Sequence, residues 1–362
     1  MPLLTDWANL QYGDVERLAS LDGLDLKDMS LSLCGIVTST DHNALETLLE
    51  LVFSVDSKRS DFIPAATQRL QTLWPETKTD QQTAASDRLL SLMFNDQANK
   101  AERSRTGRQL FESLYLSTGV LVHLVDGIQI SMDTAREQLH PNKRRRTNEN
   151  HSVTPLSAAR LSDLRKLTLI LELVDNSNPE RRPELLSGLF HVLAALHQFK
   201  SQDHSELSYL LSLTLGSLLG IIREAAPDHS EVDLSPVRLD VIIDCMRVTT
   251  SSQVQNNALL LIAGITSLDP QRVLDSIMPV FTFMGRKVLS KDDEYSNYVV
   301  DQTMDKVLPA LVESLRTRGE DLIPETSRLI STFTAAYEHI PSHRRLRLFR
   351  RLISNLGDET FL

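Results

Sequence analysis

Two clusters of positively charged side chains are the residues of this sequence with the clearest capacity for chemistry. The first is a run of four basic residues within a polar stretch: Lys143, Arg144, Arg145 and Arg146. Ammonium and guanidinium groups bind phosphate oxygens and carboxylates, and a short basic run also has the composition of a nuclear-import signal. We interpret this run as an import signal or a phosphate contact, and the alternative is a solvated loop with no specific role.

The second cluster lies near the end of the chain, where no acidic residue occurs between Pro341 and Asn355. Its members are Arg344, Arg345, Arg347, Arg350 and Arg351. Helical spacing places three of them, Arg344, Arg347 and Arg351, opposite an apolar face. That face consists of Leu346, Phe349, Ile353 and Leu356. The cluster is a candidate contact for RNA phosphates or for an acidic partner. The alternative is a solvated terminal face, or arginines that satisfy carbonyl groups near a helix C-terminus.

Motifs for catalysis and for metal binding are absent from the sequence. It has no phosphate-binding glycine loop and no dinucleotide-binding motif, and Gly216 and Gly220 lack the spacing that exposes a serine nucleophile. The ten histidines are scattered, and two cysteines cannot form a structural zinc site. The acidic run Asp292–Glu294 lacks the alternating oxygen ligands of a calcium loop. We predict a protein that is not an enzyme, needs no cofactor and has no small-molecule substrate.

Helices must position these side chains, and their pattern is clearest between Val237 and Glu313. Apolar residues recur there at spacings of three and four, the signature of a helix with one buried face. In one segment this face consists of Val254, Ala258, Leu261, Ile262 and Ile265. The hydroxyl of Ser251 or Ser252 is expected to cap the start of that helix.

The helical segments also repeat. Asp275–Phe281 resembles Asp305–Leu311 at an offset of 30 residues, and each contains a proline inside a helical pattern. Helix pairs that repeat imperfectly in this way are typical of HEAT repeats, which stack because one unit cannot bury its apolar face alone. We predict an all-α fold, a HEAT-repeat-like α-solenoid of stacked antiparallel helix pairs. An ordinary irregular helical domain is the alternative.

The composition along the chain divides it into three parts. Residues 1–135 are predicted to be N-terminal helical repeats, and residues 157–362 C-terminal HEAT-like repeats of one continuous solenoid. Between them, residues 136–156 are predicted to be a disordered basic loop, because so few apolar side chains cannot offset the entropy of ordering. Thr77–Thr83 is expected to be a turn, and Arg103–Ile130 two helices broken near Ser117–Gly119.

Composition also limits the classes of function. The 362 residues carry a formal net charge of −10, which argues against a surface that binds nucleic acid throughout. The uncharged run Leu207–Ile222 is shorter than the roughly twenty residues that cross a bilayer, and the first residues lack the features of a signal peptide. We therefore expect no membrane span. Cys34 and Cys245 are expected to be reduced core thiols of an intracellular protein.

Four segments of the central region resemble a known family. They are Gln253–Leu261, Pro279–Gly285, Asp292–Ser296 and Val307–Leu311. They are similar to the U three small nucleolar RNA-associated protein ten family, the large HEAT-repeat subunit of the UtpA, or t-UTP, subcomplex of the small-subunit processome. Members of that family are several times longer, so the resemblance implies an internal or truncated fragment. It assigns no role to either basic cluster.

The resemblance implies a nucleolar ribonucleoprotein component of ribosome biogenesis, linked to processome assembly, pre-rRNA processing and rRNA transcription. The implied partners are other UtpA subunits and processome proteins, and also the 5′ spacer of pre-rRNA or a small nucleolar RNA. Because the chain is acidic and few exposed aromatic residues are expected, we predict a non-catalytic scaffold that acts through protein–protein contacts. The alternatives are direct RNA binding through the basic clusters, which salt would weaken steeply, and a HEAT-type transport adaptor.

Overall fold

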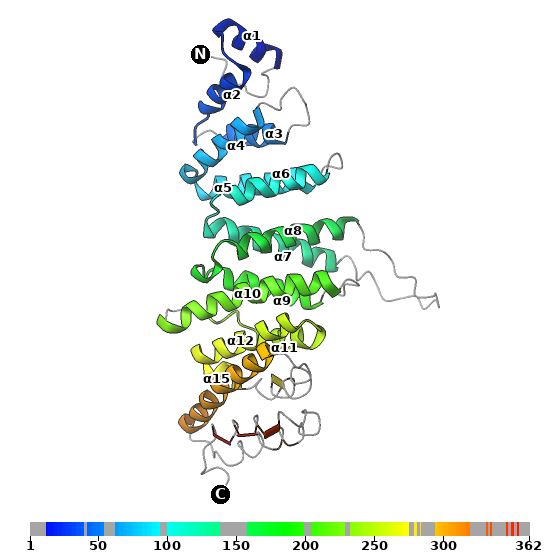
Figure 1. Ribbon diagram of the computed structural model, residues 1–362, viewed down its shortest axis with the longest axis vertical. Coiled ribbons are helices and arrows are strands. Elements are labelled where there is room, and N and C mark those ends of the chain that lie inside the picture. The colour runs from blue at the N-terminus through cyan, green and yellow to red at the C-terminus, as the bar shows by residue number, and fades with distance from the viewer. Residues whose placement is uncertain are drawn as a thin grey trace, which may run out of the picture. The chain divides into compact units, whose positions relative to one another are not determined.

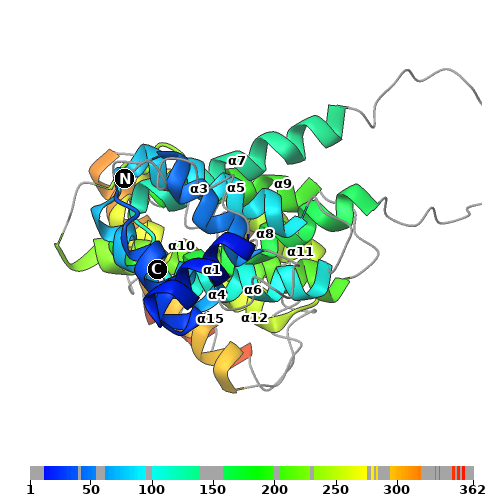
Figure 2. The ribbon, with the colours of Figure 1, turned by 90° about the horizontal axis from the view of Figure 1, so that it is seen from above.

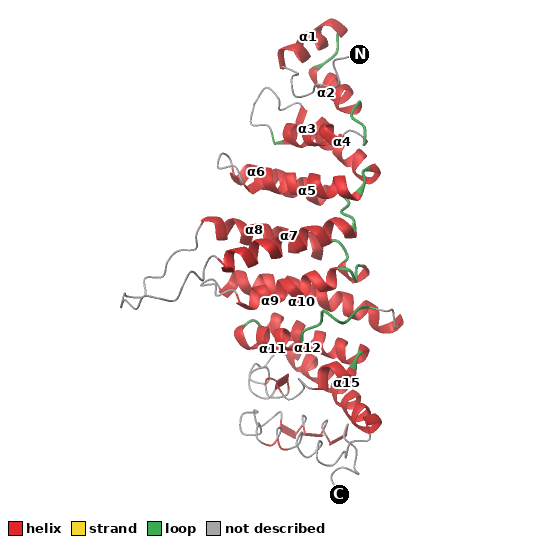
Figure 3. Cartoon of the chain, turned by 180° about the vertical axis from the view of Figure 1, so that it is seen from behind, coloured by secondary structure: helices red, strands yellow, loops and turns green. Residues whose placement is uncertain are grey.

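The computed structural model describes most of the chain and shows helices throughout the described part. The described residues are 12–39, 42–53, 62–94, 100–137, 158–198, 204–228, 232–274, 279–280, 283 and 294–318, with 331, 334, 345–346, 349–350 and 353–354. Within these ranges there is no strand (Figure 3). The chain divides into two compact units, Met1–Leu173 and Val174–Leu362.

The first unit is built from consecutive helices. They are α1 (Tyr12–Asp22), α2 (Leu26–Gly35), α3 (His42–Val52), α4 (Phe62–Leu73), the 3-10 turn η4 (Trp74–Glu76), α5 (Thr79–Phe94), α6 (Lys100–Ser113) and α7 (Thr118–Glu137); α8 (Ala158–Asp175) ends at the division. Each helix packs on near neighbours in the sequence: α4 on α2 and α3, and α5 on α3, α6 and α7 (Figure 1). The predicted break between two helices near Ser117–Gly119 is confirmed, because α6 ends at Ser113 and α7 begins at Thr118.

The second unit contains two layers of helices. Its elements are η5 (Pro179–Arg181), α9 (Leu185–Gln198), α10 (His204–Asp228), α11 (Leu239–Val248), α12 (Ser252–Leu268), α13 (Pro270–Leu274) and α15 (Glu294–Arg318). In one layer α12 packs between α10 and α15, and in the other α9 packs on α11. Figure 2 shows the same helices from above. Helix pairs that follow one another in sequence order and pack on their neighbours are the arrangement expected of HEAT repeats. The predicted all-α, HEAT-like solenoid class is confirmed.

Helix α12 occupies the centre of the second unit. The predicted buried face, from Val254 to Ile265, is confirmed, and Leu259, Leu260 and Gly264 outside that face are buried as well. An added Cβ at Gly264 would lie 2.7 Å from Cγ2 of Ile222 in α10, so a glycine is needed for the two helices to approach this closely. For Ser251 the predicted hydroxyl cap is wrong, since this residue occupies the capping position without a side-chain capping hydrogen bond.

In each unit a buried glutamine near the start of a helix supports the preceding turn. Nε2 of Gln82 in α5 donates a hydrogen bond to the carbonyl oxygen of Trp74 at 2.7 Å. Nε2 of Gln255 in α12 donates to the carbonyl oxygen of Thr249 at 2.9 Å. The predicted turn over Thr77–Thr83 is wrong from Thr79 onward, where α5 begins. Gln82 is one of the polar residues on which the predicted turn was based, but its amide is buried and donates a hydrogen bond to a carbonyl group of the turn.

Helix α10 contains a long apolar segment. Its segment Ser205–Ala225 is long and apolar enough, by length and composition alone, to cross a membrane. Half of that segment is buried inside the second unit, where α10 packs on η5, α9 and α12. Thr214 is buried within it and donates its hydroxyl hydrogen bond to the Leu210 carbonyl. This is the environment of a core helix.

Candidate interaction surfaces

The two basic clusters lie mainly outside the described residues. All four residues of the first cluster, Lys143 to Arg146, are outside them, as are Arg344, Arg347 and Arg351 of the second. Of the remaining arginines, Arg345 is half-buried and Arg350 is exposed. The proposed phosphate contacts and import signal stay predictions, as does the basic loop over residues 136–156.

The apolar face predicted opposite the second cluster is largely exposed among the residues that the structure describes. Leu346 is 68% exposed and Ile353 is 41% exposed, while Phe349 is half-buried. Leu356 lies outside the described residues. Helical periodicity identifies which side chains share a face, but burial also requires another element that packs on that face. A shared apolar face has therefore not buried Leu346 and Ile353.

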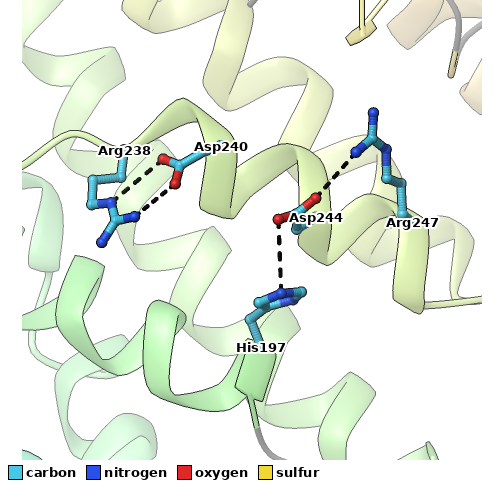
Figure 4. Close-up of polar contacts among 5 residues, drawn as sticks. All are labelled: His197, Arg238, Asp240, Asp244 and Arg247. Atoms are coloured by element: carbon cyan, nitrogen blue, oxygen red, sulfur yellow. Dashed lines mark hydrogen bonds and ion pairs between the residues drawn. The ribbon is translucent and has the colours of Figure 1, made fainter.

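A cluster of charged side chains lies on the surface of α11 (Figure 4). Nη2 of Arg238 is 2.7 Å from Oδ2 of Asp240, and the hydrogen bond from Arg238 holds the pKa of Asp240 below its usual value. One turn along, Asp244 lies 3.2 Å from Nη1 of Arg247 and 3.8 Å from Nε2 of His197 in α9. The contact between His197 and Asp244 links α9 to α11, and the two arginines compensate the carboxylates of α11.

The contact between His197 and Asp244 lacks the geometry of a catalytic pair. At 3.8 Å it is too long for a hydrogen bond, and Nδ1 of His197 is buried with no hydrogen-bond partner. A histidine that activates a serine or cysteine nucleophile lies within hydrogen-bond reach of that hydroxyl or thiol. Within the described ranges, no three His, Cys, Asp or Glu side chains form a group that could hold a metal ion. The pair thus serves as a helix–helix contact.

Both cysteines are inaccessible thiols of the core. Cys34 and Cys245 are buried and unpaired with each other. Burial raises the pKa of Cys34 to about 11 and that of Cys245 to about 12. A nucleophilic cysteine needs a lowered pKa and some exposure. The expectation that both are reduced core thiols agrees with this environment.

Exposed tyrosines are the surface feature that the sequence analysis missed. Tyr115, Tyr209, Tyr295 and Tyr298 are all exposed, and the sequence analysis singled out none of them. Two of them, Tyr295 and Tyr298, lie three residues apart near the start of α15, in a segment that is otherwise polar. That spacing places both rings on the solvent side of one helix, and it was available from the sequence.

The starts of three helices meet at one edge of the second unit. Oγ of Ser208 in α10 lies 3.4 Å from Oγ1 of Thr249 in the turn before α12. On the other side of α12, Nδ2 of Asn256 donates a hydrogen bond of 3.0 Å to Oγ of Ser296 in α15. Each of these contacts adjoins exposed side chains. Those neighbours are Tyr209, Val248 and Tyr295. The second unit therefore presents exposed aromatic and apolar side chains along this edge.

The similarity of this chain to known proteins extends over its whole length. The U3 small nucleolar RNA-associated protein 10 of Aspergillus fumigatus is 44% identical over 367 residues and matches 100% of this chain. That of Coccidioides immitis is 41% identical over 360 residues and matches 98%. The chain spans 20% of the length of each relative. The resemblance expected from residues 237–311 is confirmed.

Two further comparisons concern the fold. A family model described as HEATR1-like HEAT repeats matches residues 324–362. Among solved structures, an engineered protein matches 95% of this chain and 98% of its own length, with 13% identity and a TM-score of 0.27. A TM-score this low supports no conclusion. The HEAT-repeat assignment rests on the family model and on the packing of the helix pairs.

Proposed function

Because this chain belongs to the U3 small nucleolar RNA-associated protein 10 family, we propose that it is a non-catalytic HEAT-repeat scaffold of ribosome biogenesis. It supports assembly of the small-subunit processome, and with it pre-rRNA processing and rRNA transcription, through protein–protein contacts in the nucleolus. The observation that carries this proposal is the 44% identity along the entire chain. Since the chain spans 20% of its relatives, it contributes one section of a longer scaffold.

The chemistry of the described residues supports a scaffold over an enzyme. The two thiols are buried with raised pKa values, and His197 contacts a carboxylate across a helix interface. Polar side chains in the interior, such as Gln82 and Gln255, are used to satisfy turns. In a stack of helix pairs whose interior polar groups form hydrogen bonds within the fold, the extended outer surface is available for binding. Function then depends on the exposed side chains.

Charge supports protein partners over RNA as the main ligand. The whole chain carries a formal net charge of −10, and phosphate binding requires a local excess of lysine and arginine. The exposed tyrosines of the second unit are side chains enriched in protein–protein interfaces. The proposed partners are the other UtpA subunits and processome proteins.

Affinity purification of the tagged 362-residue chain from nucleolar extract tests the scaffold. We expect UtpA subunits to co-purify and to remain bound after nuclease digestion at physiological salt, because contacts built on apolar burial do not depend on counterion release. A matched sample without nuclease gives the reference. Loss of every processome protein on digestion would show that RNA, and not this chain, holds them.

Direct RNA binding is the second candidate, supported by the exposed Arg350 within the arginine-rich segment. It predicts tighter binding to the 5′ spacer of pre-rRNA than to an unrelated RNA, measured by titration at low and physiological salt. It also predicts that exchanging Arg344, Arg347 and Arg351 for glutamate abolishes this binding. Equal, weak and salt-sensitive binding to both RNAs would exclude this candidate. Separately, unchanged nuclear entry after deletion of Lys143–Arg146 would exclude the import signal.

A further inference from the structure

Helix α15 has a solvent face on which carboxylates and tyrosines form adjacent rows. The face opposite, from Ser296 to Leu308, is buried, and α15 packs there on α12 and α13. At 100° per residue, Glu294, Asp301 and Asp305 lie within about 40° of one another around the helix axis. The next sector, about 60° wide, holds Tyr298, Gln302 and Tyr295. An acidic row and an aromatic row therefore run side by side along the exposed side of α15.

The two tyrosines of this face are presented to solvent. Tyr295 is 57% exposed and Tyr298 is 54% exposed. Nε2 of Gln302 donates a hydrogen bond of 2.6 Å to the hydroxyl of Tyr298, which restricts the ring without covering it. A tyrosine has only two rotatable side-chain bonds, so it forms contacts at a low cost in conformational entropy. Exposed rings held in this way are suited to anchor a partner.

Charge identifies the kind of partner. Glu294, Asp301 and Asp305 contribute three carboxylates to this face, and Lys306 is the one positive side chain among residues 294–310, whose side chains the structure describes. The described part of the face therefore repels phosphates and attracts cations. A guanidinium group is planar, stacks on an aromatic ring and binds carboxylates through paired hydrogen bonds. An ammonium group can do only part of this, because it is a point charge without a planar fork. Rows of tyrosine and carboxylate at helical spacing thus match arginine better than lysine.

We propose that the exposed face of α15, centred on Tyr295 and Tyr298, is a docking site for an arginine-rich segment of a partner protein. The arginine side chains stack on the two rings and pair with Glu294, which is exposed beside them. This proposal rests on the scaffold function in taking a protein as the partner, and it adds the surface and the chemistry of recognition.

A peptide titration tests the docking site on the complete 362-residue chain. The probe is a fluorescent peptide of alternating arginine and alanine, with a matched lysine and alanine peptide, measured by anisotropy at about 0.15 M salt. We expect the arginine peptide to bind more tightly than the lysine peptide. Tyr295→Ala with Tyr298→Ala should weaken it about tenfold, and Tyr295→Phe with Tyr298→Phe should retain most of the binding, because the rings remain.

The matched control is Tyr115→Ala, which removes an exposed tyrosine of the first unit and should leave binding unchanged. Thermal unfolding of each variant confirms that these exposed substitutions preserve the fold. Equal binding by the original chain, the double alanine variant and the Tyr115→Ala variant would overturn the proposal, since it would show attraction to net charge alone. Equal affinity for the arginine and lysine peptides would overturn it as well.

Failure of this proposal is distinguishable from failure of the scaffold function. If the double alanine variant captures processome proteins as well as the original chain does, the docking site is wrong and the scaffold function stands. If the original chain captures none, the scaffold function is wrong, and the peptide titration still decides whether α15 binds arginine. Selective loss of one captured protein from the double alanine variant supports the proposal and identifies the partner.

Discussion

Replacement of Gly264 by alanine should destabilise the second unit, although alanine is the better helix former. The new Cβ would lie 2.7 Å from Cγ2 of Ile222, whereas carbon atoms in contact are normally about 3.5–4.0 Å apart. Ile222 is fully buried, and a β-branched side chain in a helix has one strongly preferred rotamer. Relief of the overlap therefore requires α10 and α12 to separate or Ile222 to leave its rotamer.

The magnitude follows from two opposing contributions. Overpacking a core contact costs about 1–3 kcal/mol, while exchange of glycine for alanine within a helix contributes about 1 kcal/mol of stability. The net expectation for Gly264→Ala is a loss of about 0–2 kcal/mol. Gly216→Ala in α10 is the matched control, because the nearest heavy atom to its added Cβ is 3.9 Å away. It should stabilise the chain by about 0.5–1 kcal/mol.

Urea denaturation of the 362-residue chain, followed by circular dichroism, measures both variants. Ile222→Leu removes the offending branch at nearly constant volume, so the double variant with Gly264→Ala should be more stable than the sum of the single effects. Stabilisation by Gly264→Ala equal to that of Gly216→Ala would refute the reasoning. It would mean that α10 and α12 are not held at close contact.

Three further predictions concern buried polar and titratable groups. Gln255→Leu leaves the turn carbonyls before α12 unpaired and should cost about 1–3 kcal/mol in urea denaturation, whereas Gln253→Leu at an exposed position of the same helix should change little. Cys34 and Cys245, with pKa values raised by burial to about 11 and 12, should react with a thiol reagent at pH 8 only after unfolding. Labelling as fast in the native state as in urea would contradict their burial. Asp175 at the C-terminal end of α8 is exposed, and partial desolvation, followed by the charge of Glu180, raises its pKa. The neutral acid therefore stabilises the fold at low pH, this stability is lost as pH rises through the raised pKa, and solvent screening keeps the effect small. Asp175→Asn should therefore stabilise the chain slightly at pH 7. The stability gained by this variant over the original chain should be larger at pH 7 than at pH 3, and an equal gain at both pH values would contradict the predicted direction.

The helical class and the buried face of α12 could be predicted because they depend on the spacing of apolar residues. That spacing reports which side chains avoid water, and Val254, Ala258 and Ile265 are indeed buried. It could not show that α12 is enclosed on its other sides, since enclosure depends on α10 and α15, which are distant in the sequence. The start of α5 was missed for a related reason. Gln82 is polar but buried, because its amide donates a hydrogen bond to a backbone carbonyl. A prediction from composition alone assumes that every polar residue is in contact with solvent.

The candidate sites were harder to predict because a binding surface consists of residues that the fold does not use. Arginine clusters attract notice in a sequence through their unusual composition, yet composition does not show where a charge lies. The segment around Tyr295 and Tyr298 is not unusual in composition. The two tyrosines can be identified as a candidate binding surface only once the opposite face of α15 is known to be buried. Their exposure is informative because an aromatic ring in solvent does not add to the hydrophobic stabilisation of the fold. Exposed rings that lie close together therefore indicate an interaction site. In a helical scaffold the periodic residues maintain the stack, and side chains that depart from that pattern are where partner recognition should be sought.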